Sequence, residues 1–340
     1  MLTHTNMKKK IAIIAGGDSS EYGVSLRSAA GIESFLNHEQ YDITTVLLRG
    51  KDWKAQVKSP ETKEEWVDID KNDFSFTYKG VKKTFDFAYI TIHGTPGENG
   101  LLQGYFDMLG IPYSCCGVLA AAMTFNKYTC NHYLKGFGVR VAESVLLRKA
   151  KGERLEVKGK DIIEQVGLPC FIKTNVGGSS FGVTKVKTVE EVQPAIDKAF
   201  AEGDEVICEA FMKGVEITCG VYKTKNKAVA FPITEVVTSN EFFDYDAKYN
   251  GQVDEITPAR IPDEVRNKVQ ALTLKIYDIL GCKGIIRVDY ILTENWTINL
   301  LEVNTTPGMT ATSFIPQQVC AAGLNIGEVL SEIVEDNFTV

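Results

Sequence analysis

The first third of the chain alternates short apolar runs with segments of helical periodicity, and this alternation restricts the possible folds more than any other feature. Lys9–Ala15 has the length and composition of a buried parallel strand, and Val24–His38 carries apolar residues at helical spacing. Alternating strands and helices predict an α/β domain with a doubly wound parallel sheet, which we place at residues 1–115. The same patterns recur at Tyr41–Leu48, Phe85–Ile92 and Leu101–Leu109.

The rest of the chain does not alternate in this way, and it predicts two further units of mixed α+β structure. The central unit spans 116–212 and has a helical segment at Val189–Ala201. The C-terminal unit spans 213–340 and contains a long amphipathic helix at Pro262–Leu280. The strands predicted in these units are Cys170–Thr174, Val183–Val186, Glu205–Phe211, Glu216–Tyr222, Ala228–Val237, Ile285–Leu292 and Trp296–Asn304.

A long polar stretch with several aromatic residues, about 238–258, shows no regular pattern. Connections of this length inside a compact domain are usually functional. Its aromatic side chains favour a lid over a site, and they are Phe242, Phe243, Tyr245 and Tyr249.

Charge and composition exclude several classes of function. The 340 residues carry 37 Lys+Arg and 44 Asp+Glu, a formal net charge of −7, so nucleic-acid binding is not expected. No apolar run approaches the ~20 residues of a membrane span, so no membrane insertion is expected. The eight cysteines form no CxxC pair and no Cys/His cluster, which indicates free thiols in a reducing cytoplasm and argues against zinc. The apolar stretch after the N-terminal lysines is too short for a signal-peptide core, so we expect a cytoplasmic protein.

The strongest group of candidate site residues lies on the last two predicted strands. Arg287 and Asp289 share one face of the first strand, and Glu302 and Asn304 share one face of the second. A two-residue turn at 294–295 would place Arg287 opposite Glu302, with Asp289 as a diagonal neighbour. Asp289, Glu302 and the amide oxygen of Asn304 could then share a magnesium ion, which prefers hard oxygen ligands completed by phosphates and water. The alternative is a solvent-facing strand pair with an ordinary Arg287–Glu302 salt bridge.

A glycine-rich segment, GGSSFG at 177–182, lies between two predicted strands. Backbone N–H groups in such a hairpin can bind phosphates, and Lys173 on the preceding strand could reach the same phosphates. The segment also matches GxSxG around Ser180, but that motif needs a strand–turn–helix and a histidine after the serine. All four histidines precede Ser180, so a serine hydrolase is disfavoured. A plain glycine-rich turn remains the other interpretation.

Four further residues carry weaker signals when each is taken alone. His93 ends a strand beside a glycine-rich loop, where ligands often bind in α/β sheets, although it could equally pack at the strand end. Glu21 stands at a helix start, where a carboxylate also favours the helix dipole. Lys127 and Lys248 could be ordinary surface lysines.

Taken together, these motifs resemble the D-alanine–D-alanine ligases of the ATP-grasp superfamily. The resemblance covers the chain from Gly16 to Ser313, with the motifs in the family's order. Three positions depart from the common pattern: Gly23 replaces a second glutamate, Asn99 an aspartate, and Phe125-Asn126 precedes Lys127 in place of Met-Asp. The motifs are GGDSSEYGVS, HGTPGENGLLQG, GIPYSCCGV, KTNVGGSS, CEAFMKGVEIT, FDYDAKY, GIIRVDY and LLEVNTTPGMT.

The resemblance implies an N-terminal α/β domain followed by an ATP-grasp fold of two α+β subdomains, and it implies a role for each site residue. The first amino acid's ammonium would pair with Glu21 near His93, and Ser313 would hold the carboxylate of the second amino acid. Arg287 and the Gly308 N–H would form an oxyanion site, and Ser179, Tyr249 and Glu21 would form a hydrogen-bonded catalytic set. The nucleotide would be bound by Lys127, Lys173, Ser179, Ser180, Glu209, Ala210, Met212, Glu216 and Lys248. Two magnesium ions, replaceable by manganese, would be bound by Asp289, Glu302 and Asn304.

The implied reaction is ATP-dependent ligation of two D-alanine molecules through an acyl phosphate, for peptidoglycan precursor synthesis, by a cytoplasmic homodimer. The inventory of residues agrees with this chemistry, because lysines and magnesium can neutralise a transferring phosphoryl group and Arg287 can stabilise a tetrahedral oxyanion. Three alternatives remain: another ATP-grasp carboxylate–amine ligase, a ligase that takes D-lactate or D-serine second, and a degenerate nucleotide-binding regulator. The retained Lys173, Arg287 and metal-site residues argue against the regulator.

Overall fold

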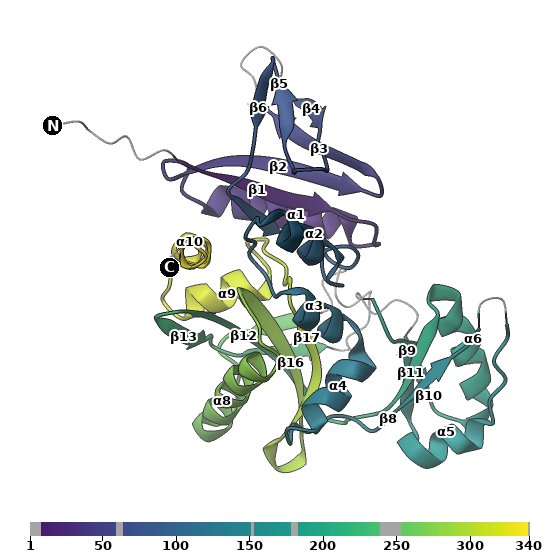
Figure 1. Ribbon diagram of the computed structural model, residues 1–340. Helices are drawn as coiled ribbons and strands as arrows, with labels where there is room; N and C mark the ends of the chain where they lie inside the picture. Colours follow the sequence, from purple (N-terminus) through teal and green to yellow (C-terminus); the bar gives the residue numbers. More distant parts are fainter. Residues whose placement is uncertain (1–7, 59–63, 151–152, 178–182, 239–252, 339–340) are drawn as a thin grey trace.

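Three large β-sheets and one two-stranded sheet form in the described residues, and Figure 1 shows their arrangement in the computed structural model. The structure describes residues 8–58, 64–150, 153–177, 183–238 and 253–338. Within those residues, no helix is both long enough and apolar enough to cross a membrane. All eight cysteines are free, as expected, and only Cys320 is exposed.

The first sheet carries the N-terminal part of the chain and has helices on both faces. In spatial order its strands are β4 (Glu65–Asp68), β3 (Asp52–Val57), β2 (Tyr41–Arg49), β1 (Lys9–Gly16) and β7 (Phe87–Ile90), and the adjoining helices are α1 (Tyr22–Phe35), α2 (Leu101–Leu109) and α10 (Ile326–Asp336). β2, β1 and β7 run parallel, whereas β3 and β4 are antiparallel. Ile11 and Ile13 pack towards α1 and α10, and Ile14 packs towards α2 on the other face. The doubly wound arrangement is therefore confirmed, with antiparallel strands added at one edge.

The polar, weakly patterned segment 51–84, for which the sequence predicts a strand hairpin with loops, forms more regular structure than that. Besides β3 and β4, the segment contains the two-stranded sheet of β5 (Phe76–Tyr78) and β6 (Val81–Lys83). This hairpin projects from the sheet at the top of Figure 1. Phe74 and Phe76 nevertheless belong to the buried cluster beneath it, which explains why so polar a segment is ordered.

The second sheet is antiparallel throughout. Its strands, in spatial order, are β10 (Thr184–Val186), β9 (Cys170–Thr174), β11 (Glu205–Ala210) and β8 (Ser144–Arg148), and it packs with α5 (Gly159–Val166) and α6 (Val192–Glu202). A short 3-10 turn, η1 (Val189–Glu191), precedes α6. We predict a capping box between Thr188 and Glu191 from the sequence, and this is wrong: Thr188 makes no side-chain cap, and Glu191 accepts from the N–H of Lys187 instead.

The third sheet forms the centre of the C-terminal half. Its strands, in spatial order, are β15 (Val253–Ile256), β14 (Thr234–Thr238), β12 (Val215–Thr224), β16 (Ile285–Thr293) and β17 (Thr297–Asn304), and β13 (Lys227–Ala230) pairs with β12. We expect a single strand over Ala228–Val237, but the structure has two, because Pro232 between them has no N–H to donate to a ladder. β15 also gives regular structure to the end of the predicted lid 238–258, whose residues 239–252 lie outside the described part of the chain.

Helices cover the third sheet in a way that joins distant parts of the sequence. α3 (Val118–Phe125), α4 (Lys127–Lys135) and α8 (Asp263–Ile279) contribute to one cluster with β12, β16 and β17. On the other face, α9 (Phe314–Ala321) packs with α10, β1 and α1 in a cluster shared with the first sheet. Residues 118–135 therefore pack on the third sheet and not on the second. The division of the chain at 115/116 and 212/213 stays a prediction.

The loop that leads into β16 approaches the segment before α3 so closely that only glycine fits. Gly284 has φ +67°, and a Cβ built there would lie 1.9 Å from the carbonyl oxygen of Ser114. We expect Gly284→Ala to lower the free energy of unfolding by roughly 1–2 kcal/mol for the left-handed backbone and by a further 1–3 kcal/mol for overpacking.

The matched control for this prediction is Gly281→Ala in the same loop. Gly281 has φ +61°, but a Cβ added there would meet nothing within 4 Å, so only the backbone cost of about 1–2 kcal/mol is expected. Denaturant unfolding of the two variants measures the difference. Equal destabilisation of the two variants would show that the close approach of Ser114 does not exclude a side chain at position 284.

Candidate active site

A cavity of about 1320 Å³ lies between the second and third sheets and reaches the loops of the first. All candidate site residues from the sequence that lie in the described part of the chain line this cavity. They come from several separate stretches of the chain. Loops after β1 and β7 reach it from one side, and β9, β11, β12, β16 and β17 supply its walls. The lining residues among our selections are Glu21, His93, Lys127, Lys173, Glu209, Ala210, Met212, Glu216, Arg287, Asp289, Glu302, Asn304, Gly308 and Ser313.

The two strands with the acidic residues pair in a different register from the predicted one. Asp289 lies opposite Glu302, and Arg287 lies opposite Asn304. The prediction that Arg287 faces Glu302 is wrong for two local reasons. The turn η2 (Glu294–Trp296) has three residues, two of them with positive φ, so Thr293 pairs with Thr297. The register also shifts between Asp289 and Tyr290.

Arg287 and Asp289 form a buried, two-point ion pair on the floor of the cavity. The Arg287 Nε and Nη2 donate to Oδ1 and Oδ2 of Asp289 at 2.9 and 2.8 Å. Burial alone would lower the pKa of Arg287, but the charge and hydrogen bonds of Asp289, with the charges of Glu302 and Glu216, together outweigh burial and the net pKa is raised. The alternative interpretation of the sequence pairs Arg287 with Glu302 in an ordinary salt bridge. The structure pairs Arg287 with Asp289 instead, because residues two apart on one strand share a face.

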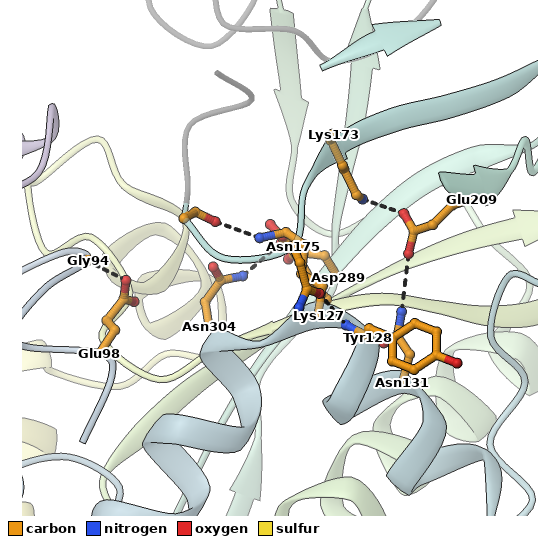
Figure 2. A network of polar contacts seen from close by, with 12 residues as sticks. Gly94, Glu98, Lys127, Tyr128, Asn131, Lys173, Asn175, Glu209, Asp289 and Asn304 are labelled. Atoms are coloured by element: carbon orange, nitrogen blue, oxygen red, sulfur yellow. Dashed lines mark hydrogen bonds and ion pairs between the residues drawn. The ribbon is translucent and has the colours of Figure 1, made fainter. Parts of the chain in front are cut away.

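The predicted magnesium ligands lie together around this ion pair. Asn304 Nδ2 donates to Asp289 Oδ2 at 3.0 Å, which leaves the Asn304 amide oxygen available (Figure 2). Across the strand pair, Glu302 lies opposite Asp289 and 4.0 Å from the Lys127 Nζ. Two carboxylates and an amide oxygen suit magnesium, which keeps waters and takes phosphate oxygens as further ligands. Among the described residues, no group of three or more His, Cys, Asp or Glu side chains forms a fuller metal cage.

The opposite wall of the cavity carries a second buried ion pair. Lys173 Nζ lies 2.5 Å from Glu209 Oε2, and the two side chains point towards one another from β9 and β11 (Figure 2). Asn131 on α4 donates to the other Glu209 oxygen at 3.4 Å. Burial would lower the pKa of Lys173, but the charge and hydrogen bond of Glu209 outweigh it, and the net pKa is raised.

Lys127 connects the glycine-rich segment with the acidic strands. Its Nζ donates to the carbonyl oxygen of Gly177 at 2.5 Å while remaining near Glu302. Burial lowers the pKa of Lys127, and the charge of Glu302 offsets this only partly. With 15% of its side chain exposed and two partners inside the cavity, Lys127 is not the ordinary surface lysine that the sequence also allows.

The loops after β1 and β7 form the third side of the cavity. Glu21 precedes α1, and His93 follows β7, with His93 Nε2 3.4 Å from Ser28 Oγ. Glu98 is not among the residues selected from the sequence, yet it lies half-buried beneath this loop, lines the cavity and accepts from the N–H of Gly94 at 2.7 Å (Figure 2). Burial raises the pKa of Glu98. Its position within HGTPGENG is the signal that could have found it.

Gly308 and Ser313 border the same cavity from the loop between β17 and α9. A Cβ at Gly308 would lie 3.0 Å from Ser313 Oγ, and Ser313 Oγ accepts from the N–H of Thr310 at 3.1 Å. Four selected residues, Ser179, Ser180, Lys248 and Tyr249, lie outside the described part of the chain. The segment 178–182 is followed by β10, an antiparallel partner of β9, and not by the helix that a serine nucleophile motif requires.

Comparison with known proteins gives one consistent answer. Two family models match the chain, one described as D-ala D-ala ligase N-terminus over residues 10–116 and the other as D-ala D-ala ligase C-terminus over residues 133–335. A curated D-alanine–D-alanine ligase of Bacteroides fragilis is 65% identical over 98% of this chain and 100% of its own length.

Solved structures agree with the sequence relatives. A D-Ala:D-Ser ligase from Enterococcus faecalis superimposes with a TM-score of 0.84 at 32% identity, covering 97% of this chain and 99% of its own. A D-alanine–D-alanine ligase from Bacillus anthracis, solved in complex with ATP, gives a TM-score of 0.75 at 27% identity and covers 97% of both chains.

Proposed function

This chain belongs to the D-alanine–D-alanine ligase family, and we propose that the cavity between its second and third sheets is where ATP activates one D-alanine for attack by another. The protein is an ATP-dependent ligase with the ATP-grasp fold, and it serves peptidoglycan precursor synthesis. The observation that carries the proposal for the site is that one cavity brings together an arginine, two carboxylates, an amide and two lysines, with the three cationic side chains largely shielded from solvent. Phosphoryl transfer requires such an arrangement, because its transition state is stabilised mainly by positioned positive charge.

The nucleotide is proposed to lie between β9, β11 and β12. Glu209 accepts the adenine amino group, Ala210 and Met212 line the base, and Glu216 binds the ribose. Lys173 and Lys127 contact the phosphates. Because Lys173 and Glu209 pair with one another here, nucleotide binding must share or open that pair. Ser179, Ser180 and Lys248 remain predicted nucleotide ligands outside the described residues.

Magnesium is proposed to be held by Asp289, Glu302 and Asn304. When bound, the metal neutralises phosphate charge. Two ions, and manganese as a substitute, form part of this proposal, supported by the number of hard oxygen donors that meet here.

The first D-alanine is proposed to bind beneath the loops after β1 and β7. Glu21 pairs with its ammonium near His93, and the half-buried Glu98 holds the His93–Gly94 loop through the Gly94 N–H. Ser313 binds the carboxylate of the second D-alanine. Tyr249 and Ser179 stay predicted partners of Glu21.

The reaction proceeds in two steps, phosphoryl transfer followed by acyl transfer. A carboxylate oxygen of the first D-alanine attacks the γ-phosphorus of ATP, the bond to the β-γ bridging oxygen breaks, and ADP leaves. The amine of the second D-alanine, after losing a proton, attacks the acyl carbon, and phosphate departs with the C–O bond electrons. Arg287 and the Gly308 N–H are placed to stabilise the oxyanion between these events.

An isotope experiment tests the acyl phosphate directly. D-Alanine labelled with ¹⁸O in both carboxylate oxygens should pass one labelled oxygen to each phosphate released. Mass spectrometry of the phosphate measures this transfer. Release of unlabelled phosphate in step with dipeptide formation would contradict the proposed intermediate.

The competing candidate is a ligase that uses D-serine or D-lactate as its second substrate. The similarity to a solved D-Ala:D-Ser ligase supports this candidate. The curated relatives at 65% identity favour D-alanine. We also place the protein in the cytoplasm, where its ATP is available and where its free thiols persist.

A homodimer is proposed to form through the exposed faces of α2 and α3. Met108 and Leu119 are 82% and 73% exposed, and Leu101 is 64% exposed on the same face of α2 as Met108. The two helices are in contact, because a Cβ at Gly100 would lie 2.9 Å from the Val118 carbonyl oxygen. Exposed apolar side chains gathered on two contacting helices favour a partner, and a second copy of the chain is the simplest one.

Replacing Leu119 with glutamate is expected to weaken this dimer by at least about 10-fold in Kd, because the charge must be desolvated in an apolar interface. Sedimentation equilibrium measures the change. The control is Val81→Glu, at a residue that is 55% exposed on the distant β6, which should leave the association unchanged. A parent protein that is monomeric at micromolar concentration would overturn the proposal.

A further inference from the structure

One buried hydroxyl beside the acidic strands makes no hydrogen bond in the described part of the chain. It belongs to Thr218 on β12, a residue that is 2% exposed, and the unpartnered atom is Oγ1. A buried hydroxyl without a hydrogen bond lowers the free energy of unfolding. Its presence here is therefore better explained by a functional role than by folding stability. Thr218 lines the active-site cavity, which places that hydroxyl where a bound group could use it.

Thr218 lies directly across the sheet from Asp289. The two residues are register partners on β12 and β16, and neighbouring side chains on one face of such a pair have their Cβ atoms about 4.5–5.5 Å apart. The backbone of Thr218 is firmly held, because Gln318 donates to its carbonyl oxygen at 3.0 Å and accepts from the N–H of Gly220 at 2.9 Å. The backbone contacts therefore hold Thr218 beside Asp289, and none of them involves the Thr218 hydroxyl.

Asp289 must change partners during the reaction that the proposed function assigns to this site. Arg287 now occupies both of its carboxylate oxygens, and Asn304 adds a bond to Oδ2 only. A cation bound by Asp289 repels the guanidinium, and the oxyanion role requires Arg287 to reach a substrate carbonyl. Once Arg287 leaves, Asp289 Oδ1 keeps no donor among the described residues.

We propose that Thr218 is a positioning residue whose hydroxyl takes over from Arg287 as the hydrogen-bond donor to Asp289 when magnesium binds. Carboxylates that ligate metals are themselves held by hydrogen bonds, and loss of such a bond typically weakens metal affinity by about 10–100-fold. The inference rests on the proposed function, since it assumes that Asp289 is a metal ligand.

The test compares metal affinity with metal-free stability in four variants of the full-length protein. Binding of Mn²⁺ in the presence of ADP is measured by electron paramagnetic resonance, and melting temperature is measured without metal or nucleotide. Thr218→Val, which removes only the hydroxyl, should weaken Mn²⁺ binding about 10-fold. The same variant should melt about 2–4 °C higher, because an unsatisfied polar group is gone. Thr218→Ser retains the hydroxyl and should bind Mn²⁺ within about 2-fold of the parent.

Thr184→Val provides the matched control. Thr184 also has a buried hydroxyl without a partner among the described residues, but it lies on β10 and does not line the cavity. This variant should leave Mn²⁺ affinity unchanged. A Thr218→Val protein that binds Mn²⁺ as tightly as the parent, or that melts several degrees lower, would overturn the inference.

Asp289→Asn separates this inference from the proposed metal site. If Asp289→Asn abolishes Mn²⁺ binding while Thr218→Val leaves it intact, the metal site stands and the role of Thr218 fails. If Asp289→Asn binds Mn²⁺ like the parent, the metal assignment itself fails.

Discussion

Replacing Arg287 with lysine is expected to lower kcat by at least about 10²-fold while ATP binding stays within a few-fold of the parent. The guanidinium is a planar, permanently charged fork, and here it is held by two hydrogen bonds to Asp289, whereas an ammonium offers a point charge. A lysine cannot reproduce that geometry or reach the oxyanion in the same orientation. Loss of one well-placed donor to an oxyanion costs about 10²–10³-fold in kcat. Steady-state kinetics and nucleotide titration measure the two quantities.

Arg260→Lys is the matched control for this variant. Arg260 is also paired with a carboxylate, that of Glu235, but its side chain is 63% exposed and does not line the cavity. Its replacement should change kcat by less than about 2-fold. If Arg287→Lys abolished ATP binding with the fold intact, Arg287 would serve the nucleotide phosphates and not the oxyanion.

Replacing Glu302 with glutamine should lower turnover by at least about 10²-fold, the scale of a lost electrostatic contact to the transition state. The change keeps the shape of the side chain but removes a charge beside Asp289 and Lys127, at the proposed metal site. The defect should appear at every magnesium concentration that can be reached, because the amide oxygen of glutamine can ligate a metal but brings no negative charge to it. Phosphate release with varied Mg²⁺ measures it.

Glu294→Gln is the corresponding control, because Glu294 is exposed in the turn at the other end of the same strand pair. It should behave like the parent. Near-normal turnover of Glu302→Gln would remove Glu302 from the metal site.

Local sequence pattern predicted the elements of this fold well where short-range chemistry determines them. The strand Lys9–Ala15 and the helix Leu101–Leu109 are confirmed almost residue by residue, because a buried parallel strand is uniformly apolar and Gly110 ends the helix in the left-handed region. Most of the selected site residues that line the cavity were also predictable, since they belong to motifs with their own chemical character.

Pairing between distant residues was not predictable in the same way. The register of β16 and β17 depends on positive φ at Asn295 and Trp296, and nothing in residue type favours that conformation at a tryptophan. The Lys173–Glu209 pair and the packing of residues 118–135 on the third sheet depend on three-dimensional contacts between segments far apart in the chain. Thr218 ends the motif CEAFMKGVEIT, but the motif gives it no role, and only its burial and its lack of a partner among the described residues identify it.

The most direct test of the central claim is phosphate release by the purified protein with ATP and Mg²⁺ across a panel of D- and L-amino acids and D-lactate, with the products identified by mass spectrometry. The account predicts rapid release with D-alanine alone, one D-alanyl-D-alanine formed per phosphate, and little product from L-alanine, D-serine or D-lactate. Faster product formation with D-serine or D-lactate as the second substrate, or phosphate release that depends on no amino acid in the panel, would contradict it.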